Sequence, residues 1–218
     1  MMTRNATRAA LLASTLLGGA TLMAMQPTTV AATLEPAPTA APARSAGPEL
    51  MAGTYEIDGT HSSVIFSILH NDVSPAYGRF NVISGSFVVG KSLEESSVSV
   101  EIATSSVDTN SEDRDKHLRS PDFFNAKQFP KITFVSKSIE NREGTAYMVA
   151  GNLTCHGVTK PVTIEMQLLG SGDKGRSGHL AGFGGEVTID RREFGITTYP
   201  DALGADVRLL FGIEAVRK

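Results

Sequence analysis

Apolar and polar residues alternate over most of the chain beyond residue 60, which is the spacing of a β-strand with one buried face. The clearest run is 97–104, where Val98, Val100 and Ile102 share one face. Similar runs, bounded by turn-forming residues, predict eight strands, at 62–70, 78–89, 97–104, 131–140, 145–155, 160–169, 178–190 and 205–216. Residues 55–58 are expected to be a short extended segment that leads into the first strand. Segments 141–144 and 170–177 are expected to be turns.

Eight consecutive strands joined mostly by short connections indicate an antiparallel meander. An open sheet of that size would expose two edges and a broad apolar face, so the expected fold is all-β, an eight-stranded antiparallel barrel. A two-sheet sandwich is the alternative that the pattern alone leaves open. The chain has no Trp and 21 Gly, which favours a barrel with a cavity over one filled by bulky side chains.

The alternation stops between residues 107 and 134, where charges concentrate over 112–119 and phenylalanines follow. Ser111 is a suitable N-cap for a short helix starting at Glu112, and Ser120-Pro121 would end that helix. Because this segment lies between the third and fourth predicted strands, we expect a helical lid over one open end of the barrel.

The N-terminal region has the order of a secretory signal peptide. Arg4 and Arg8 precede an uncharged apolar run, and small residues follow it near position 31. We therefore expect a signal at 1–32, a Pro- and Ala-rich linker at 33–52 and one folded domain at 53–218, in a periplasmic or secreted protein. The alternative is an uncleaved membrane anchor at 9–25, since that run is at the short limit for spanning a bilayer.

Composition and motifs exclude several classes of function. The net charge is −3 and no Lys/Arg run stands out, which argues against nucleic-acid binding. The single cysteine, Cys155, rules out an intrachain disulfide, and its neighbour His156 would point to the opposite face of a strand, which disfavours a Cys–His catalytic pair. The five histidines lack metal-binding spacing, and no serine elbow, phosphate loop or dinucleotide fingerprint is present. The sequence predicts no catalytic residue, no metal site and no resident cofactor.

Several motifs resemble those of the YceI-like family, in the family's order and over the whole of 53–218. They are Tyr55-x-Ile-Asp-x-x-His61-Ser-Ser-Val-x-Phe66, Gly78-Arg-Phe80, Asp113-Arg-Asp-x-His-Leu-Arg-Ser-x-Asp-Phe-Phe124, Phe129-Pro-x-Ile-Thr-Phe134, Gly151-x-Leu-Thr-x-His-Gly-Val-Thr-Lys-Pro161 and Ile189-x-Arg-x-x-Phe-Gly-Ile196. The resemblance implies a lipocalin-like barrel whose elongated pore binds a polyisoprenoid or related long-chain amphiphile, commonly in the bacterial periplasm. Cys155 replaces the usual aliphatic residue, and segments 69–72 and 199–203 depart from the pattern near the pore mouth.

Two groups of residues are the candidate ligand contacts. Strand alternation assigns one group to the pore lining: Val64, Phe66, Ile68, Phe80, Val100, Phe134, Ile164, Leu209 and Phe211. The lid segment supplies a second group for a headgroup at the mouth: Arg114, His117, Arg119, Phe123 and Phe124. The alternative for the charged members is that they pair with Asp113, Asp115 and Asp122 and fasten the lid.

The expected function is therefore binding of a long-chain isoprenoid or quinone-like amphiphile, for transport, storage or sequestration, by a protein whose homodimerisation is left open. One alternative is a hydrolase or isomerase that acts on a lipid in the same pore, with His117 or His156 as base. Another is a structural or stress-response factor whose barrel is plugged and holds no ligand.

Overall fold

A computed structural model describes residues 50–218 of the chain. The expected signal peptide and most of the expected linker lie outside these residues, so the division at residues 32 and 52 stays a prediction. No helix among residues 50–218 has the length and apolar character needed to cross a membrane.

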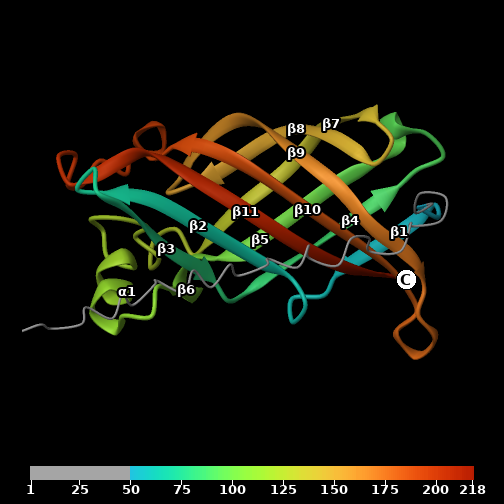
Figure 1. Ribbon diagram of the computed structural model, residues 1–218, viewed down its shortest axis with the longest axis horizontal. Coiled ribbons are helices and arrows are strands. Elements are labelled where there is room, and N and C mark those ends of the chain that lie inside the picture. The colour runs from blue at the N-terminus through green and yellow to red at the C-terminus, as the bar shows by residue number, and fades with distance from the viewer. Residues whose placement is uncertain (1–49) are drawn as a thin grey trace, which may run out of the picture. The chain divides into compact units, whose positions relative to one another are not determined.

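The described chain is a closed antiparallel barrel with eight positions around its wall (Figure 1). The sheet order is β1-β4-β5-β7-β8-β9-β10-β11-β2-β3-β6, and a further pairing of β1 with β11 closes the ring. The strands are β1 (Gly53–Ile57), β2 (Ser63–His70), β3 (Ser74–Phe80), β4 (Ile83–Val89), β5 (Ser97–Ala103), β6 (Val107–Asp108), β7 (Lys131–Glu143), β8 (Ala146–Cys155), β9 (Val158–Asp173), β10 (His179–Asp190) and β11 (Leu203–Arg217). The barrel prediction is confirmed, and the two-sheet alternative is wrong.

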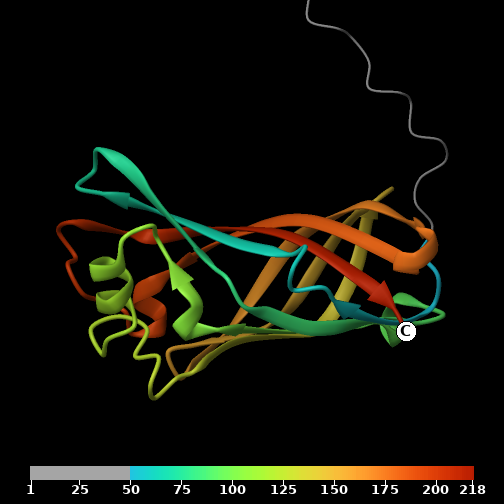
Figure 2. The same ribbon diagram turned by 90° about the horizontal axis from the view of Figure 1, so that it is seen from below.

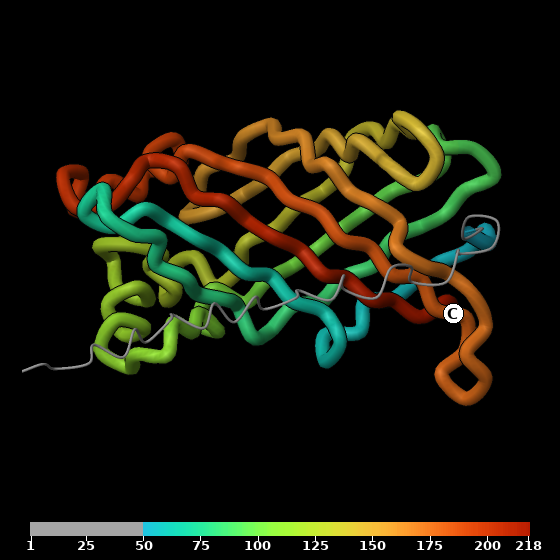
Figure 3. The backbone as a smooth tube through the Cα atoms, in the orientation of Figure 1, coloured from blue at the N-terminus to red at the C-terminus, as the bar shows by residue number. Residues whose placement is uncertain are grey.

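Eleven strands fill eight positions because three positions are each shared by two strands. The long strand β11 pairs with β2 along residues 203–212 and with β1 along 215–217, on the same edge. The next position in the ring is shared by β3 and β4, and the one after it by β5 and β6. A short break in the chain separates the two strands of each pair. Figure 3 shows the backbone of β11 running the length of the barrel beside both partners.

Four predicted boundaries are wrong. The single strand predicted at 78–89 is two strands, since β3 ends at Phe80 and β4 begins at Ile83. Residues 53–57 form strand β1, which closes the ring instead of merely leading into it. Segment 141–144 is mostly strand, because β7 continues to Glu143, and β9 likewise continues to Asp173. None of residues 140–143 of β7 and 170–173 of β9 is buried, so these ends lack the alternation that a buried face imposes on a sequence.

The predicted helix is present as α1 (Glu112–Leu118) at one end of the barrel (Figure 1). Its start at Glu112 agrees with the prediction, but the Ser111 side chain makes no capping hydrogen bond. Four short 3-10 turns complete the structure: η1 (Leu93–Glu95), η2 (Thr104–Ser106), η3 (Gly175–Ser177) and η4 (Arg191–Phe194).

Candidate functional site

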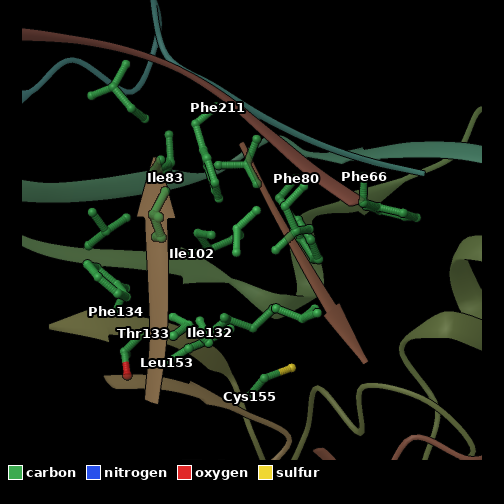
Figure 4. Close-up of a pocket in the computed structure, with 18 of the residues that line it drawn as sticks. Phe66, Phe80, Ile83, Ile102, Ile132, Thr133, Phe134, Leu153, Cys155 and Phe211 are labelled. Carbon is green, nitrogen blue, oxygen red and sulfur yellow. The ribbon is translucent and has the colours of Figure 1, made fainter. Parts of the chain in front are cut away.

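The barrel encloses a cavity of about 900 Å³. Its wall includes Arg114 and Tyr199 near helix α1, and Leu93 and Ser97 near the other end of the barrel. The wall between these ends is formed by the inward side chains of the strands, most of them aliphatic or aromatic (Figure 4). The barrel is therefore hollow over much of its length.

All nine residues predicted for the pore lining lie on the cavity wall. Strand alternation places them there, because inward positions recur at every second residue. Phe66, Phe80 and Phe134 are almost fully buried, and the ring centroids of Phe66 and Phe80 are 5.7 Å apart. Their contact with a ligand stays a prediction.

The same alternation identifies further residues of the cavity wall. Ile102 and Ile132 share faces with Val100 and Phe134, and both line the cavity (Figure 4). Other wall residues that the sequence analysis did not assign are Ile57, Ile83, Phe87, Val98, Leu153, Val162, Met166, Phe183, Val187 and Ile189.

Cys155 also lines the cavity, and its side chain is buried. Burial raises the pKa of its thiol to about 12, which keeps the sulfur protonated and unreactive. His156 is absent from the cavity wall, and its Nδ1 lies 3.1 Å from the carbonyl oxygen of Phe194. The two neighbours therefore do not form a catalytic pair.

Four of the five predicted mouth residues line the cavity, namely Arg114, His117, Phe123 and Phe124. Phe124 packs edge-on against Phe80, with ring centroids 5.5 Å apart, so the lid segment contacts the pore wall directly. Arg119 is not on the wall. Its Nη1 donates to the carbonyl oxygen of Val107 at 3.4 Å, which ties the end of α1 to β6.

The lid is fastened mainly by contacts other than the predicted ion pairs. Only His117 follows that prediction, with its Nε2 3.0 Å from Oδ2 of Asp122. Arg114 donates through Nε to Oγ1 of Thr109 (2.7 Å) and through Nη2 to the carbonyl oxygen of the same residue (2.6 Å). Asp115 accepts from the backbone N–H and the hydroxyl of Thr109. Among the described residues no carboxylate pairs with Arg114, so its charge remains available at the cavity.

Arg191 is a cavity residue that sequence reasoning missed. Its side chain is only 5% exposed, and its guanidinium donates to the carbonyl oxygens of Ile196, Thr198, Leu203 and Gly204. These bonds hold the connection between β10 and β11 against the barrel. Burial lowers the pKa of Arg191, and the neighbouring Arg192 acts in the same direction. The available signal was its place in the motif Ile189-x-Arg-x-x-Phe-Gly-Ile196.

The cavity wall carries few groups that could act as a catalytic base. None of the wall residues in the described part of the chain is Asp or Glu, and its histidines are His70 and His117. Nε2 of His117 lies 3.0 Å from Oδ2 of Asp122.

A separate cluster of Asp58, His61 and Glu214 lies away from the cavity wall. His61 Nδ1 is 2.8 Å from Asp58 and 3.9 Å from Glu214, which is the geometry of a histidine–carboxylate ion pair. Hydrogen bonds from Thr60 and His61 lower the pKa of Asp58, and the hydrogen bond to Asp58 raises the pKa of His61. The cluster joins the end of β1, the start of β2 and strand β11.

The sequence model of the YceI-like domain matches residues 55–215. A Salmonella newport protein called YceI is 43% identical over 167 residues, which cover 75% of this chain and 87% of that protein. A Pseudomonas aeruginosa protein described as a UPF0312 protein is also 43% identical, with the same coverage.

Solved structures have the same fold. BcnA of Burkholderia cenocepacia has a TM-score of 0.66 at 24% identity and matches 72% of this chain and 98% of its own. The YceI protein of Campylobacter jejuni has a TM-score of 0.59 at 28% identity, covering 67% of this chain and 87% of its own. A polyisoprenoid binding domain from Saccharophagus degradans has a TM-score of 0.60 at 14% identity, covering 77% and 100%. The family model spans most of the chain, and the chain therefore belongs to the YceI-like family.

Proposed function

We propose that this protein binds a long-chain amphiphile of the isoprenoid or quinone-like class, with the tail inside the barrel and the headgroup toward α1. The observation that carries the proposal is the apolar cavity of about 900 Å³ inside a closed ring of strands. The polyisoprenoid binding domain from Saccharophagus degradans shares this fold, which supports the choice of ligand class.

The volume of the cavity sets the size of the tail. Ligand pockets span roughly 300–1,000 Å³, so this one is near the upper end of the range. At about 30 Å³ per non-hydrogen atom, the liquid volume of a water molecule, the cavity holds on the order of 30 atoms. Burial of that many carbons contributes roughly 24 kcal/mol before entropic costs, at about 0.8 kcal/mol each. If about one third of this remains, the affinity is micromolar.

The polar groups around α1 orient the ligand. Arg114 lines the cavity, and its Nη1 has no protein hydrogen-bond partner among residues 50–218. A guanidinium in that position donates strongly to phosphate, carboxylate or quinone oxygens. His117 and Tyr199 lie next to each other on the same part of the wall, with ring centroids 6.0 Å apart. These groups determine the orientation of the headgroup, while the apolar wall supplies most of the affinity.

We also propose that the protein is exported, on the evidence of the signal-like residues 1–32. Sequencing the N-terminus of the protein isolated from its producing cells tests this point. A start shortly after residue 31 is expected, and an intact Met1 in the cytosol would contradict export.

A fluorescence titration of lipid-stripped protein with all-trans-retinol, an isoprenoid alcohol, tests the binding function. Saturable binding of one retinol per barrel, displaced by a longer polyprenol, is the expected result. Absence of saturable binding, or failure of the polyprenol to compete, would contradict the proposal.

A further inference from the structure

An exposed apolar surface surrounds the cavity mouth near α1. Three of the four most exposed large hydrophobic side chains among residues 50–218 are there: Val73 (83%), Tyr77 (60%) and Tyr199 (54%). With Leu69, which is 42% exposed, they form what we call the mouth patch. Leu69, Val73 and Tyr77 belong to the β2–β3 hairpin, and Tyr199 belongs to the connection between β10 and β11.

The two parts of the mouth patch are joined in space. The N–H of Asn71, in the hairpin turn, donates to the carbonyl oxygen of Ala202 at 2.7 Å, and His70 pairs with Leu203 across β2 and β11. Tyr77 and Tyr199 also line the cavity. The apolar surface therefore continues from the inside of the barrel to its exposed rim.

The folding of the hairpin does not require an apolar tip. Asn71 and Asp72 have φ values of 51° and 53°, which is usual for Asn and Asp in a tight hairpin turn. Val73 follows them and is almost fully exposed, at a position where a polar residue would cost nothing in packing. The side chain of Val73 is therefore available for a role in binding.

The strand pairing of the barrel wall is incomplete beside the hairpin. Within the described part of the chain, the outer edge of β3 is paired only at Arg79 and Phe80, with β6, so residues 74–78 have no neighbouring strand there on that side. Figure 2 shows the hairpin bending away from α1 at this point. Tyr77, on this unpaired edge, is 60% exposed and also lines the cavity, so we place an opening of the cavity between the hairpin and the lid segment.

We infer that the mouth patch docks on the surface of a lipid bilayer, so that a lipid passes between the membrane and the cavity through this opening. The inference rests on the proposed function, because a long apolar tail is too poorly soluble to reach the cavity through water at a useful rate. Exposed tyrosines beside aliphatic side chains match the membrane–water interface. The charges in these two segments balance: Asp72 and Arg79 in the hairpin, and two arginines and two acids in residues 191–202. Neutral phosphatidylcholine is therefore a sufficient partner.

The docking is tested with a dye that reports a change from water to lipid. An environment-sensitive fluorophore is attached to the full-length protein at S74C, in the hairpin, or at the matched control S138C on β7; both positions are exposed. The native Cys155 is buried and remains unlabelled. Addition of phosphatidylcholine vesicles is expected to shift the emission of the S74C dye to shorter wavelength, and to leave the S138C dye unchanged.

A pair of substitutions completes the test. L69D/V73D is expected to abolish the shift, to lower vesicle binding at least about tenfold and to slow retinol transfer from vesicles equally. V82D/V135D, with two comparably exposed valines elsewhere on the barrel, is the control. Neither Leu69 nor Val73 lines the cavity, so titration with free retinol should not change.

Equal vesicle binding by L69D/V73D and the wild type would overturn the inference. So would an S74C shift that appears only when copies of the protein associate, without vesicles. If retinol does not bind even to the wild type, the proposed function fails, whereas the vesicle shift still reports on docking.

Discussion

The two ends of the barrel are closed in different ways. At the end away from α1, Tyr55 is fully buried and stacks on Phe87, with ring centroids 4.7 Å apart, and Ala181 and Ala215 pack beside them. These side chains belong to the strands of the ring. At the α1 end the cover is a helix and coil outside the ring, and the edge of β3 is partly unpaired. The first end contributes a packed cluster to the core, and the second is the end at which the proposed ligand would enter.

Tyr55 and Tyr77 belong to strands of the same barrel but differ greatly in exposure, because they lie at different ends. Tyr55 donates its hydroxyl to the carbonyl oxygen of Met51 and contributes to the packed end. Tyr77 is 60% exposed beside the opening. A fold with two packed ends would have no entrance, and one with two loose ends would lose much of its core.

The largest expected effect is on stability. Tyr55→Ala removes a buried ring at the packed end and should lower the free energy of unfolding by about 3–5 kcal/mol. Tyr77→Ala removes an exposed ring at the open end and should change it by less than about 0.5 kcal/mol. Urea unfolding followed by circular dichroism measures both, and equal losses would show that the ends do not differ as described.

The next effect is on ligand occupancy. Ile164→Trp places an indole in the cavity and should lower retinol affinity at least about tenfold, because the tail loses volume that it needs. Thr163→Trp puts the same side chain on the outer face of β9 and should leave the affinity unchanged. If the two variants bind retinol equally well, the tail is not held in the cavity.

A smaller effect concerns the headgroup. Arg114→Gln removes a charge-assisted hydrogen bond at a partly exposed site, worth about 1 kcal/mol, and should weaken retinoate binding roughly fivefold. Retinol, which carries no charge, should bind as before. Lys116→Gln, on the same helix but not on the cavity wall, is the control. Weaker binding of retinol and retinoate alike would place the headgroup elsewhere.

The smallest effect is the pH dependence of the stability that the Asp58–His61 ion pair contributes. This pair lies in the connection between β1 and β2. The raised pKa of His61 contributes stability that is complete below about pH 6.5, its value in an unfolded chain, and is lost as the pH rises through the folded value. The lowered pKa of Asp58 contributes stability that is present above about pH 4 and is lost as the pH falls through the folded value.

The two contributions of this pair coincide between about pH 4 and 6.5. His61→Gln should therefore lower the melting temperature more at pH 5.5 than at pH 8.5, as measured by differential scanning calorimetry. An equal decrease at both pH values would show that the pair carries no pH-dependent stability.

Much of the barrel could be predicted from the sequence because its strands have one buried face. Alternation located most of the strands, although it merged β3 with β4, and it placed residues such as Phe66 and Leu209 on the cavity wall. Alternation is weak where neither face of a strand is buried, as at the ends of β7 and β9, and where a strand is short, as in β1.

The mouth could not be predicted to the same degree, since it is formed by irregular segments. No periodic pattern shows that Arg191 turns inward to bind four carbonyl oxygens, or that Arg119 turns away from the cavity. The open edge of β3 depends on how far β6 extends, which is a property of tertiary pairing. Chain order alone places these segments between strands without defining their orientation.

Mass spectrometry of the native protein, purified from the cells that produce it, tests directly whether the barrel holds a lipid. We expect a complex that exceeds the mass of the polypeptide by one lipid, and an isoprenoid or quinone-like molecule in the organic extract. A mass that always equals that of the bare polypeptide, with no lipid in the extract, would contradict this expectation.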